Sequence, residues 1–565
     1  MTSTNLVVIG GSAAGAKAAA KAKRLNEAAN VTIIQKGADL SMAACGYPYY
    51  VGGVFDERKM LLCTPTGVVR DPAFFAKAKG ITALTETEVM AIDREQKRVH
   101  CLNLRTREEQ TIPYDKLIIA TGASANLPPI PNIDLDGIHT LLSMEDSDAL
   151  RRIRDAQQVK KAVIIGGGLI GVETCEALQL SGMEVTVVEL QDQVLPFLDW
   201  RMAKLVENHM HASGATILTS TGLKEFRGKE GKLSGVVLAD GSVLDCELAV
   251  MAMGVRPNSG LAARAGLAIG KLGGISVDQY MQSSDPHIYA AGDCVEINNC
   301  NTGDKTFSPM GDLANLEGRV AGENVILGNS VTFPGTYQTG ICKIFNFTAG
   351  STGLSEKVAQ QTGFSDYETV VNASPDKPGF MGAKLLISKL LVSTRDQRIL
   401  GYQCVGPGDV SKQIAMAAMA IQGKMTVEQL VNADLPYAPP FSLAIDHFIA
   451  SAHIIQNKLK GRMKGTDATA VWERIQQGEE LFLMDARSPE EFEEMQLGIG
   501  EKLVPLGAVR ARLEELPADK EQEIICFCKI SMRGYETATI LRAHGYTNVR
   551  VMEGGLMAWP YPRKR

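Results

Sequence analysis

Two glycine-rich turns, each between an apolar strand and a helix, constrain this chain more than any other feature. The first 35 residues read NLVVIG, GSAAG, AKAAAKAKRLNE and VTIIQ, a pattern that predicts strand, turn, helix and strand. Gly10, Gly11 and Gly15 fall at the turn, where backbone N–H groups and the positive helix end can hold a pyrophosphate. Ser12 replaces the middle glycine, and Gln35 stands where an acidic residue would bind a ribose hydroxyl. Alone, this match also fits a glycine turn in another α/β unit.

The second turn makes a chance match an unlikely explanation. The stretch AVIIGGGLIGVETCEAL places Gly166, Gly168 and Gly171 in complete G-x-G-x-x-G spacing after an apolar strand. The next strand ends at Glu189, 18 residues beyond Gly171, which suits a hydrogen bond to a free ribose 2′-hydroxyl. The residues that follow, LQDQ, contain no arginine to receive a 2′-phosphate, so NADH is favoured over NADPH. Two nucleotide-binding α/β units are predicted.

Three later strand ends fit the same architecture. KLIIATGA carries Thr121 and Gly122, LAVMAMGVRPN carries Gly254, and HIYAAGDC carries Gly292 and Asp293. A carboxylate at the last of these strand ends can accept hydrogen bonds from the ribityl hydroxyls of a flavin. Capping a helix in the following segment is an alternative role for Asp293 that is compatible with the first.

Composition narrows the class of protein. A chain of 565 residues is too long for one core, and its formal net charge of -6 argues against broad nucleic-acid binding. It has no apolar run long enough to span a membrane, and its first strand begins too early to leave room for a signal peptide. Eleven scattered cysteines do not resemble a disulfide framework. We expect a protein of the reducing cytoplasm, with no metal site.

The order of GGSAAG, a lone Cys45, ATGA, GGGLIG, AMGVRPN and AAGD resembles the single-cysteine branch of the pyridine nucleotide-disulfide oxidoreductases. Within it, SMAACGYPYY is similar to the S-F-x-x-C-x-x-P-Y segment of coenzyme A-disulfide reductases. The resemblance covers residues 1 to about 455. It implies FAD at the first glycine turn, NADH at the second, and a cysteine that faces the flavin.

Cys45 is then the predicted redox centre. Residues 46–50 contain no cysteine, so an internal disulfide is excluded, and the thiol must alternate with a sulfenic acid or a mixed disulfide. The flavin and the start of a following helix are expected to lower its pKa. A buried structural thiol is the commoner fate of a cysteine, but the position in this family favours a functional one.

The middle of the chain resembles the dimerisation domain of that family, which implies a homodimer. ADLPYAPPFS places Tyr437 where the family has a tyrosine that reaches the partner's cysteine and can donate a proton to a leaving sulfur. Packing beside Pro439 and Pro440 is the alternative. The family's tyrosine pair in G-Y-Y-P-G is replaced here by Phe380 and Met381, so one expected proton donor is missing.

The C-terminal part resembles a single rhodanese domain. Asp485 and Arg487 stand in MDAR, the loop CKISMR runs from Cys528 to Arg533, and Glu553-Gly554-Gly555 with Trp559 lies near the end. The N–H groups of a six-residue loop before a helix can converge on the cysteine sulfur and stabilise a thiolate and then a persulfide.

Three residues in or near this loop have further expected roles: Arg533, Cys526 and Ser531. Arg533 either stabilises the sulfur anion or holds the shape of the loop. Cys526 is expected to pack in the core. Ser531 replaces a glycine that is common in this loop, which allows backbone strain or an altered substrate fit.

The predicted fold is α/β, with two Rossmann-like domains, an α+β dimerisation domain and an α/β rhodanese domain. The expected boundaries are residues 1–112 with 271–328 for the FAD-binding domain, 113–270 for the NAD-binding domain, 329–455 for the dimerisation domain, 456–467 for a linker and 468–565 for the rhodanese domain.

The whole chain looks like the fusion of coenzyme A-disulfide reductase with rhodanese, whose members include NADH-dependent persulfide and polysulfide reductases. The predicted function is reduction of sulfane sulfur at Cys45, with Cys528 relaying sulfur and coenzyme A as carrier. The alternatives are a coenzyme A-disulfide reductase, an NADH oxidase or peroxidase, and a redox-sensing sulfur carrier. A basic group can bind coenzyme A phosphates or form a solvated helix face: Lys17, Lys21, Lys23 and Arg24.

Overall fold

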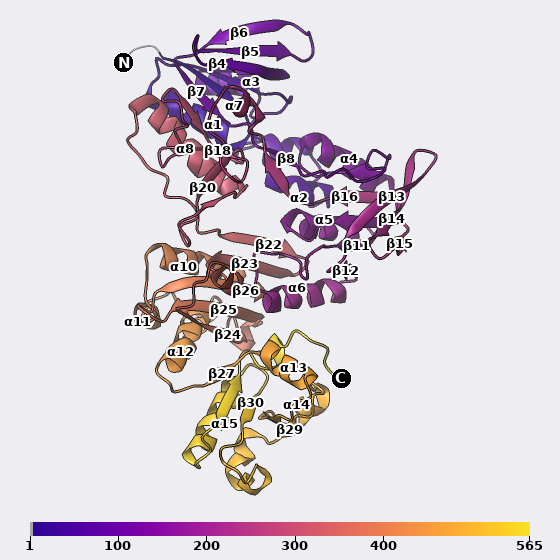
Figure 1. The fold of residues 1–565 in the computed structure, drawn as a ribbon, viewed down its shortest axis with the longest axis vertical. Helices are drawn as coiled ribbons and strands as arrows, with labels where there is room; N and C mark the ends of the chain where they lie inside the picture. The colour runs from indigo at the N-terminus through magenta and orange to yellow at the C-terminus, as the bar shows by residue number, and fades with distance from the viewer. Residues whose placement is uncertain (1–3, 565) are drawn as a thin grey trace. The chain divides into compact units, whose positions relative to one another are not determined.

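The computed structural model describes residues 4–564, so the outer limits of the first and last predicted domains lie outside it. The chain divides into two compact units (Figure 1). The first unit runs to Gln191 and resumes at Leu218–Thr336, and the second comprises Asp192–Ile217 and the chain from Tyr337 onward. No helix among the described residues is both long and apolar enough to cross a bilayer.

The first unit contains a parallel sheet in the order β19-β7-β1-β2-β3. Its apolar strands are buried on both faces, as parallel strands covered by helices must be. Gly318 and Gly322 let helix α8 approach α1, because a Cβ at either position would lie 2.4 Å from an α1 carbonyl oxygen. The elements are β1 (Asn5–Ile9), α1 (Ala13–Leu25), β2 (Asn30–Ile34), β3 (Ile81–Leu84), β7 (Lys116–Ile119), β19 (Ile288–Ala290) and α8 (Gly311–Leu327).

Shorter elements surround this sheet. The unit also contains an antiparallel sheet β4-β5-β6, a mixed sheet β18-β20-β21 in which β18 runs parallel to β20, and short helices in the segment around Cys45. Their bounds are η1 (Ala44–Gly46), α2 (Tyr47–Val51), η2 (Arg58–Leu62), α3 (Pro72–Lys79), β4 (Thr87–Asp93), β5 (Arg98–Asn103), β6 (Glu109–Pro113), α7 (Gly260–Arg264), β18 (Ile275–Ser276), β20 (Val295–Asn298) and β21 (Lys305–Thr306).

A second parallel sheet follows the second glycine turn, with β11-β10-β16-β9 as its strands in the first unit. A hairpin sheet β13-β14-β15 and the antiparallel pair β8 with β17 accompany it. The elements are β8 (Ala123–Ala125), β9 (Ile138–His139), α4 (Met144–Ala156), β10 (Lys161–Ile165), α5 (Leu169–Gln179), β11 (Glu184–Val188), β12 (Thr216–Leu218, at the division between the units), β13 (Leu223–Lys229), β14 (Lys232–Leu238), β15 (Val243–Leu244), β16 (Leu248–Met251) and β17 (Val255–Pro257).

The second unit begins with α6 and an antiparallel sheet in the order β22-β23-β26-β25-β24, which leaves β24 at an edge. Helices α10 and α12 cover its apolar face. The bounds are α6 (Trp200–Ala212), β22 (Gly340–Ile344), β23 (Phe347–Gly353), α9 (Glu356–Gln361), β24 (Tyr367–Pro375), η3 (Gly379–Met381), β25 (Leu385–Ser393), β26 (Ile399–Gly406), α10 (Val410–Gln422), α11 (Val427–Val431) and α12 (His447–Leu459).

The C-terminal part of the second unit is a parallel sheet in the order β27-β31-β30-β28-β29. The expected linker is largely structured, because α12 extends to Leu459 and β27 already pairs with β31. The bounds are β27 (Gly465–Thr466), α13 (Ala468–Gln476), β28 (Phe482–Asp485), α14 (Pro489–Glu494), β29 (Lys502–Leu503), η4 (Leu506–Ala511), η5 (Leu513–Glu515), β30 (Ile524–Phe527), α15 (Met532–Ala543), β31 (Val549–Met552) and η6 (Leu556–Ala558). The predicted mixed α/β architecture is confirmed.

Candidate active sites

A cavity of about 780 Å³ opens at the carboxyl ends of the strands in the first sheet. In an open parallel sheet this is the edge where nucleotides bind. The turns after β1, β2, β7 and β19 bring six of the predicted residues into its lining: Gly10, Ser12, Gln35, Thr121, Gly122 and Asp293. The sequence motifs therefore converge on one cavity.

The first turn needs its glycines for close packing. Gly10 has φ of +101°, and a Cβ there would lie 2.0 Å from the Ala120 carbonyl oxygen. A Cβ at Gly15 would lie 1.8 Å from the carbonyl oxygen of Gly10. The N–H of Gly11 donates to Oε1 of Gln35 at 2.8 Å, so Gln35 also braces the turn. In the described part of the chain α1 starts without a side-chain cap, which leaves its first N–H groups available to a phosphate.

The second turn repeats this construction. Gly166 has φ of +112°, and a Cβ at Gly171 would lie 2.0 Å from the carbonyl oxygen of Gly166. The residue that precedes helix α5 is Gly168, which has no side chain to cap the first N–H groups of this helix. Glu189 accepts the N–H of Gly167 at 2.6 Å and that of Gln191 at 2.7 Å, which fixes its carboxylate beside the turn. The residues fit a dinucleotide whose ribose carries free hydroxyls.

The remaining strand-end residues serve the backbone turns as well as the cavity. The hydroxyl of Thr121 donates to the Asn258 carbonyl oxygen at 2.6 Å, which joins two strand ends. Gly122, Gly254 and Gly292 all have positive φ, a conformation that glycine adopts without strain. Gly292 also donates its N–H to Oε2 of buried Glu317 at 2.6 Å.

Asp293 lies in the cavity lining, and burial raises its pKa to about 6. The alternative role of helix capping is wrong, because the next element is the strand β20 rather than a helix. A half-buried carboxylate that lines a cavity fits a ligand with hydroxyl donors, as the sugar-alcohol chain of a flavin would supply.

Cys45 lies in η1, next to cavity-lining Ala44, and its thiol is exposed in the single chain. The N-terminus of α8 lies beside it, since a Cβ at Gly311 would lie 3.2 Å from the Cys45 sulfur. The N-terminus of the 17-residue α8 therefore lies near the sulfur, in addition to that of the five-residue α2, which begins two residues after Cys45.

The groups of the protein itself raise the pKa of Cys45, and the expected lowering by the flavin stays a prediction. Burial raises the pKa of the thiol, and the negative charges of Glu173, Asp293 and Asp312 raise it further. The protein alone therefore favours the protonated thiol. A bound cofactor or substrate that places positive charge or hydrogen-bond donors near the sulfur would lower this pKa and favour the thiolate.

Sequence reasoning missed Glu173, which projects from α5 toward the Cys45 region. Tyr49 donates a hydrogen bond to Oε1 of Glu173 at 3.3 Å, and burial raises the pKa of Glu173 to about 7. The only signal was its position two residues after Gly171 in the second fingerprint. A carboxyl group that titrates near neutrality beside a redox thiol is typical of active sites.

The basic group on α1 is partly committed to internal contacts. Lys21 forms an ion pair with Glu323 of α8 at 2.9 Å, and Lys23 donates to the backbone oxygens of Glu27 and Ala29. Lys17 is half-buried and Arg24 is exposed. Lys17 and Arg24 remain the candidates for phosphate contacts.

Tyr437 lies in the second unit between α11 and α12, and 54% of it is exposed. The side chain is therefore largely accessible. Phe380 and Met381 form part of the exposed turn η3, with Phe380 80% exposed. The role of Tyr437 toward a partner's cysteine stays a prediction.

The C-terminal sheet presents Cys528 at the end of β30, in a loop that leads into α15. Its side chain is 1% exposed, and its carbonyl oxygen accepts the N–H of Leu556 at 2.9 Å. Arg533 forms two hydrogen bonds to Glu491, at 2.6 and 2.8 Å, which hold the loop against α14. Glu491 and, after it, Cys528 raise the pKa of Arg533, so the guanidinium also faces the sulfur.

The MDAR strand end holds α14 in place. Buried Asp485 and Arg487 pair at 2.7 Å, and Arg487 also donates to the carbonyl oxygens of Glu491 and Met495. Cys526 packs in the core, as predicted, and burial raises its pKa. Ser531 adopts φ of +80°, a left-handed conformation that is strained for a non-glycine residue, so of the two open alternatives the structure shows backbone strain.

Family models match three parts of the chain: "Pyridine nucleotide-disulphide oxidoreductase" at residues 4–310, its dimerisation domain at 339–448, and "Rhodanese-like domain" at 467–560. The chain belongs to the pyridine nucleotide-disulphide oxidoreductase family. This confirms the predicted resemblance, including the fused rhodanese domain. The family implies FAD and a pyridine nucleotide as cofactors, and the two glycine turns and the strand-end cavity fit them.

Three similar proteins extend this result. A solved structure named "NAD-Dependent Persulfide Reductase from A. fulgidus" is 41% identical with a TM-score of 0.92, covering 98% of this chain and all of that one. An "NADH oxidase" of Methanocaldococcus jannaschii is 33% identical over 81% of this chain and 99% of its own length. An "NAD(P)H coenzyme A polysulfide/persulfide reductase" of Pyrococcus horikoshii is 32% identical over 80% of this chain and 98% of its own.

Proposed function

We propose that this chain is an NADH-dependent FAD enzyme that reduces the sulfane sulfur of coenzyme A persulfide or polysulfide to hydrogen sulfide. One observation carries the proposal: a single chain holds Cys45 beside a dinucleotide cavity and Cys528 at the head of a rhodanese loop. The first thiol can reduce a sulfur species and the second can carry one. The persulfide reductase from A. fulgidus supports this reading over nearly the full chain.

Cys45 acts as the nucleophile. Its thiolate attacks the inner sulfur of the persulfide RSSH, forming a Cys45–S–S–R disulfide and releasing HS⁻. FAD, when bound, passes the electron pair of NADH to this disulfide. The Cys45 thiolate and RSH are thereby restored, so that RSSH, NADH and H⁺ give RSH, H₂S and NAD⁺.

Other residues of the chain bind and move sulfur. Cys528 takes a sulfane sulfur from polysulfide or another donor, and the loop ending at Arg533 stabilises the resulting persulfide anion. Lys17 and Arg24 hold coenzyme A phosphates as point charges, with Lys21 and Lys23 behind them. Tyr437 donates a proton to a leaving sulfur on the partner subunit.

The functional form is a homodimer in a reducing compartment, the cytoplasm. Large apolar side chains lie exposed over the dimerisation domain, which a monomer would leave in water: Phe380, Met419, Phe441 and Ile445. None of the eleven cysteines forms a disulfide within the described residues. Sedimentation of the intact protein beside a Phe441→Glu variant tests the dimer, which the charge should weaken.

The test of function is hydrogen sulfide release coupled to NADH oxidation, without oxygen, on coenzyme A persulfide and coenzyme A disulfide. Faster turnover of the persulfide that Cys45→Ser abolishes supports the proposal. Cys528→Ser should then fail on polysulfide while it retains activity on coenzyme A persulfide. A better rate with the disulfide, unaffected by Cys528→Ser, overturns the proposal in favour of a coenzyme A-disulfide reductase.

A second candidate is an NADH oxidase, because the M. jannaschii relative carries that name. Cys45 would then cycle through a sulfenic acid. Steady oxygen consumption by NADH alone, lost in Cys45→Ser, distinguishes this activity from sulfur reduction. A redox-sensing sulfur carrier would instead give only a stoichiometric burst.

A further inference from the structure

The junction segment, Glu553–Met557, forms one wall of the Cys528 loop. The N–H groups of Leu556 and Met557 donate to the carbonyl oxygens of Cys528 and Lys529, at 2.9 and 3.0 Å. Gly555 permits this contact, because a Cβ there would lie 2.3 Å from the Cys528 carbonyl oxygen. The position of the sulfur loop therefore depends on the position of the junction segment.

Arg201, from α6, binds the opposite side of the same segment. Its guanidinium donates from Nη2 to the Glu553 carbonyl oxygen at 2.6 Å and from Nε to the Ala558 carbonyl oxygen at 2.9 Å. Nη1 pairs with Asp467 at 2.7 Å. The residue is buried, and each of its three guanidinium nitrogens donates one hydrogen bond to the C-terminal part of the chain.

The Glu553 side chain makes a second attachment. Its carboxylate accepts the N–H of Val371, on edge strand β24, at 2.9 Å and the ammonium of Lys458 at 2.6 Å. Lys458 also contacts Glu368 and the Thr369 carbonyl oxygen. Burial raises the pKa of Glu553, and the charge of Lys458 opposes that effect. A buried carboxylate thus closes the free edge of the dimerisation sheet.

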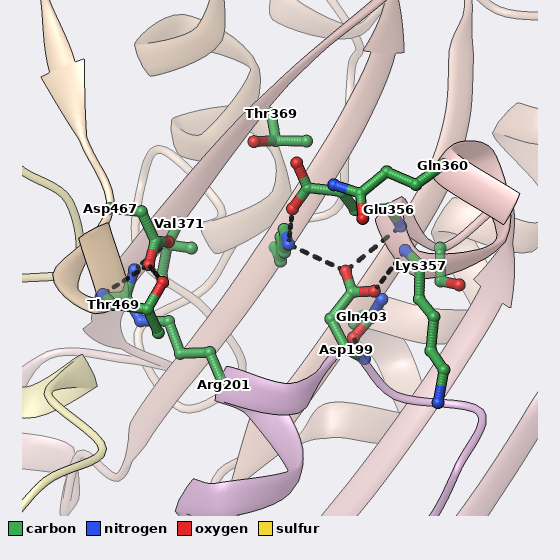
Figure 2. Close-up of polar contacts among 12 residues, drawn as sticks. Asp199, Arg201, Glu356, Lys357, Gln360, Thr369, Val371, Gln403, Asp467 and Thr469 are labelled. Carbon is green, nitrogen blue, oxygen red and sulfur yellow. Dashed lines mark hydrogen bonds and ion pairs between the residues drawn. The ribbon is translucent and has the colours of Figure 1, made fainter. Parts of the chain in front are cut away.

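The start of α6 is itself fixed, which gives Arg201 a defined direction. Asp199, two residues earlier, accepts the N–H groups of Glu356 and Lys357 and pairs with Lys389 at 2.9 Å. The backbone N–H of Asp199 donates to Oε1 of Gln403 at 2.8 Å. Figure 2 shows this cluster beside the Arg201–Asp467 pair.

We propose that Arg201 is a positioning residue for the sulfur-accepting loop: it fixes the junction segment, and with it the N–H and guanidinium groups around Cys528. The sulfurtransferase step depends on α6 and β24, which lie outside the rhodanese domain in the sequence. This inference rests on the proposed role of Cys528 as a sulfur carrier and assigns Arg201 no contact with substrate.

The test uses the intact FAD-loaded protein with thiosulfate and cyanide. The Cys528 thiolate takes the outer sulfur of thiosulfate and releases sulfite, and cyanide removes that sulfur as thiocyanate. Arg201→Gln should lower kcat/KM for thiocyanate formation about tenfold, mainly through kcat, since a small displacement of reacting groups has effects of this size. The pH profile of Cys528 alkylation should shift as well.

Two variants and one control keep the result interpretable. Glu553→Gln, which retains the acceptor for Val371 N–H, should give a smaller loss of the same kind. Arg474→Gln removes a comparable arginine of the rhodanese domain, bonded to Glu479 and Glu523, and should change neither profile. The rate at which NADH bleaches the flavin should stay the same in all three.

The outcomes separate the two proposals. If the wild type forms no thiocyanate beyond the Cys528→Ser background, the sulfur-carrier function fails. If the wild type is active and Arg201→Gln matches Arg474→Gln in both kcat and alkylation profile, the positioning role alone is overturned.

Discussion

Ser531 offers a quantitative test of the rhodanese loop. It has φ of +80° and donates its hydroxyl to the Met552 carbonyl oxygen at 2.9 Å. The left-handed conformation costs a non-glycine residue about 1–2 kcal/mol. The hydrogen bond returns about 0.5–1.5 kcal/mol, and glycine would lose about 0.5–1 kcal/mol more chain entropy on folding. These terms nearly cancel for a change to glycine.

The two substitutions therefore have different expected results. Ser531→Gly removes both the strain and the hydrogen bond, and should leave the free energy of unfolding within about 1 kcal/mol of wild type. Ser531→Ala keeps the strain and removes the hydrogen bond, so it should destabilise the protein by about 1 kcal/mol. That loss lowers the urea midpoint by roughly 0.5 M.

Tryptophan fluorescence reports this change selectively. All three tryptophans, Trp200, Trp472 and Trp559, lie in the second unit, whereas flavin fluorescence reports the first. Urea unfolding followed by both signals should show a shift in the tryptophan transition alone. Equal midpoints for Ser531→Ala, Ser531→Gly and wild type would refute the balance of strain and hydrogen bonding argued here.

Three further changes test the first unit. Asp312→Asn removes a negative charge that raises the Cys45 pKa, so alkylation of Cys45 should begin at lower pH, whereas Glu323→Gln on the same helix should have no effect. Gly311→Ala places a Cβ 3.2 Å from the Cys45 sulfur, so it should slow the alkylation of Cys45 and lower the free energy of unfolding by about 1–3 kcal/mol. An unchanged alkylation rate would contradict the close approach of Gly311 to the sulfur. Glu189→Ala removes the acceptor of the Gly167 N–H and should raise the KM for NADH about tenfold. Equal KM values for the wild type and Glu189→Ala would count against a role of Glu189 in NADH binding.

The nucleotide turns could be predicted because their signals are local. Gly10, Gly15, Gly166 and Gly171 each need the absence of a side chain for a contact within the same strand–turn–helix unit or with the neighbouring strand end. Glu189 follows at the spacing that one further strand imposes. The rhodanese loop was predictable for the same reason, although the sequence left open whether Ser531 brings backbone strain, which its φ of +80° shows.

The electrostatics of Cys45 could not be predicted in this way. The sequence argument considered the helix that follows Cys45, but the charges that raise its pKa come from Glu173, Asp293 and Asp312, which are distant in the chain. The attachment of Arg201 to Glu553 and Asp467 is equally non-local, and no motif marks it. Such contacts depend on which elements pack together, and residue spacing carries no information on that.

The two sulfur sites differ in how their surroundings treat negative charge. At Cys528 the guanidinium of Arg533 faces the sulfur, which favours a negative charge such as that of a persulfide anion. At Cys45 three carboxyl groups and burial favour the protonated thiol. Under the function proposed above, Cys528 is the site that carries sulfur and Cys45 the site that reduces it, and a bound cofactor that lowers the pKa of Cys45 would favour its thiolate.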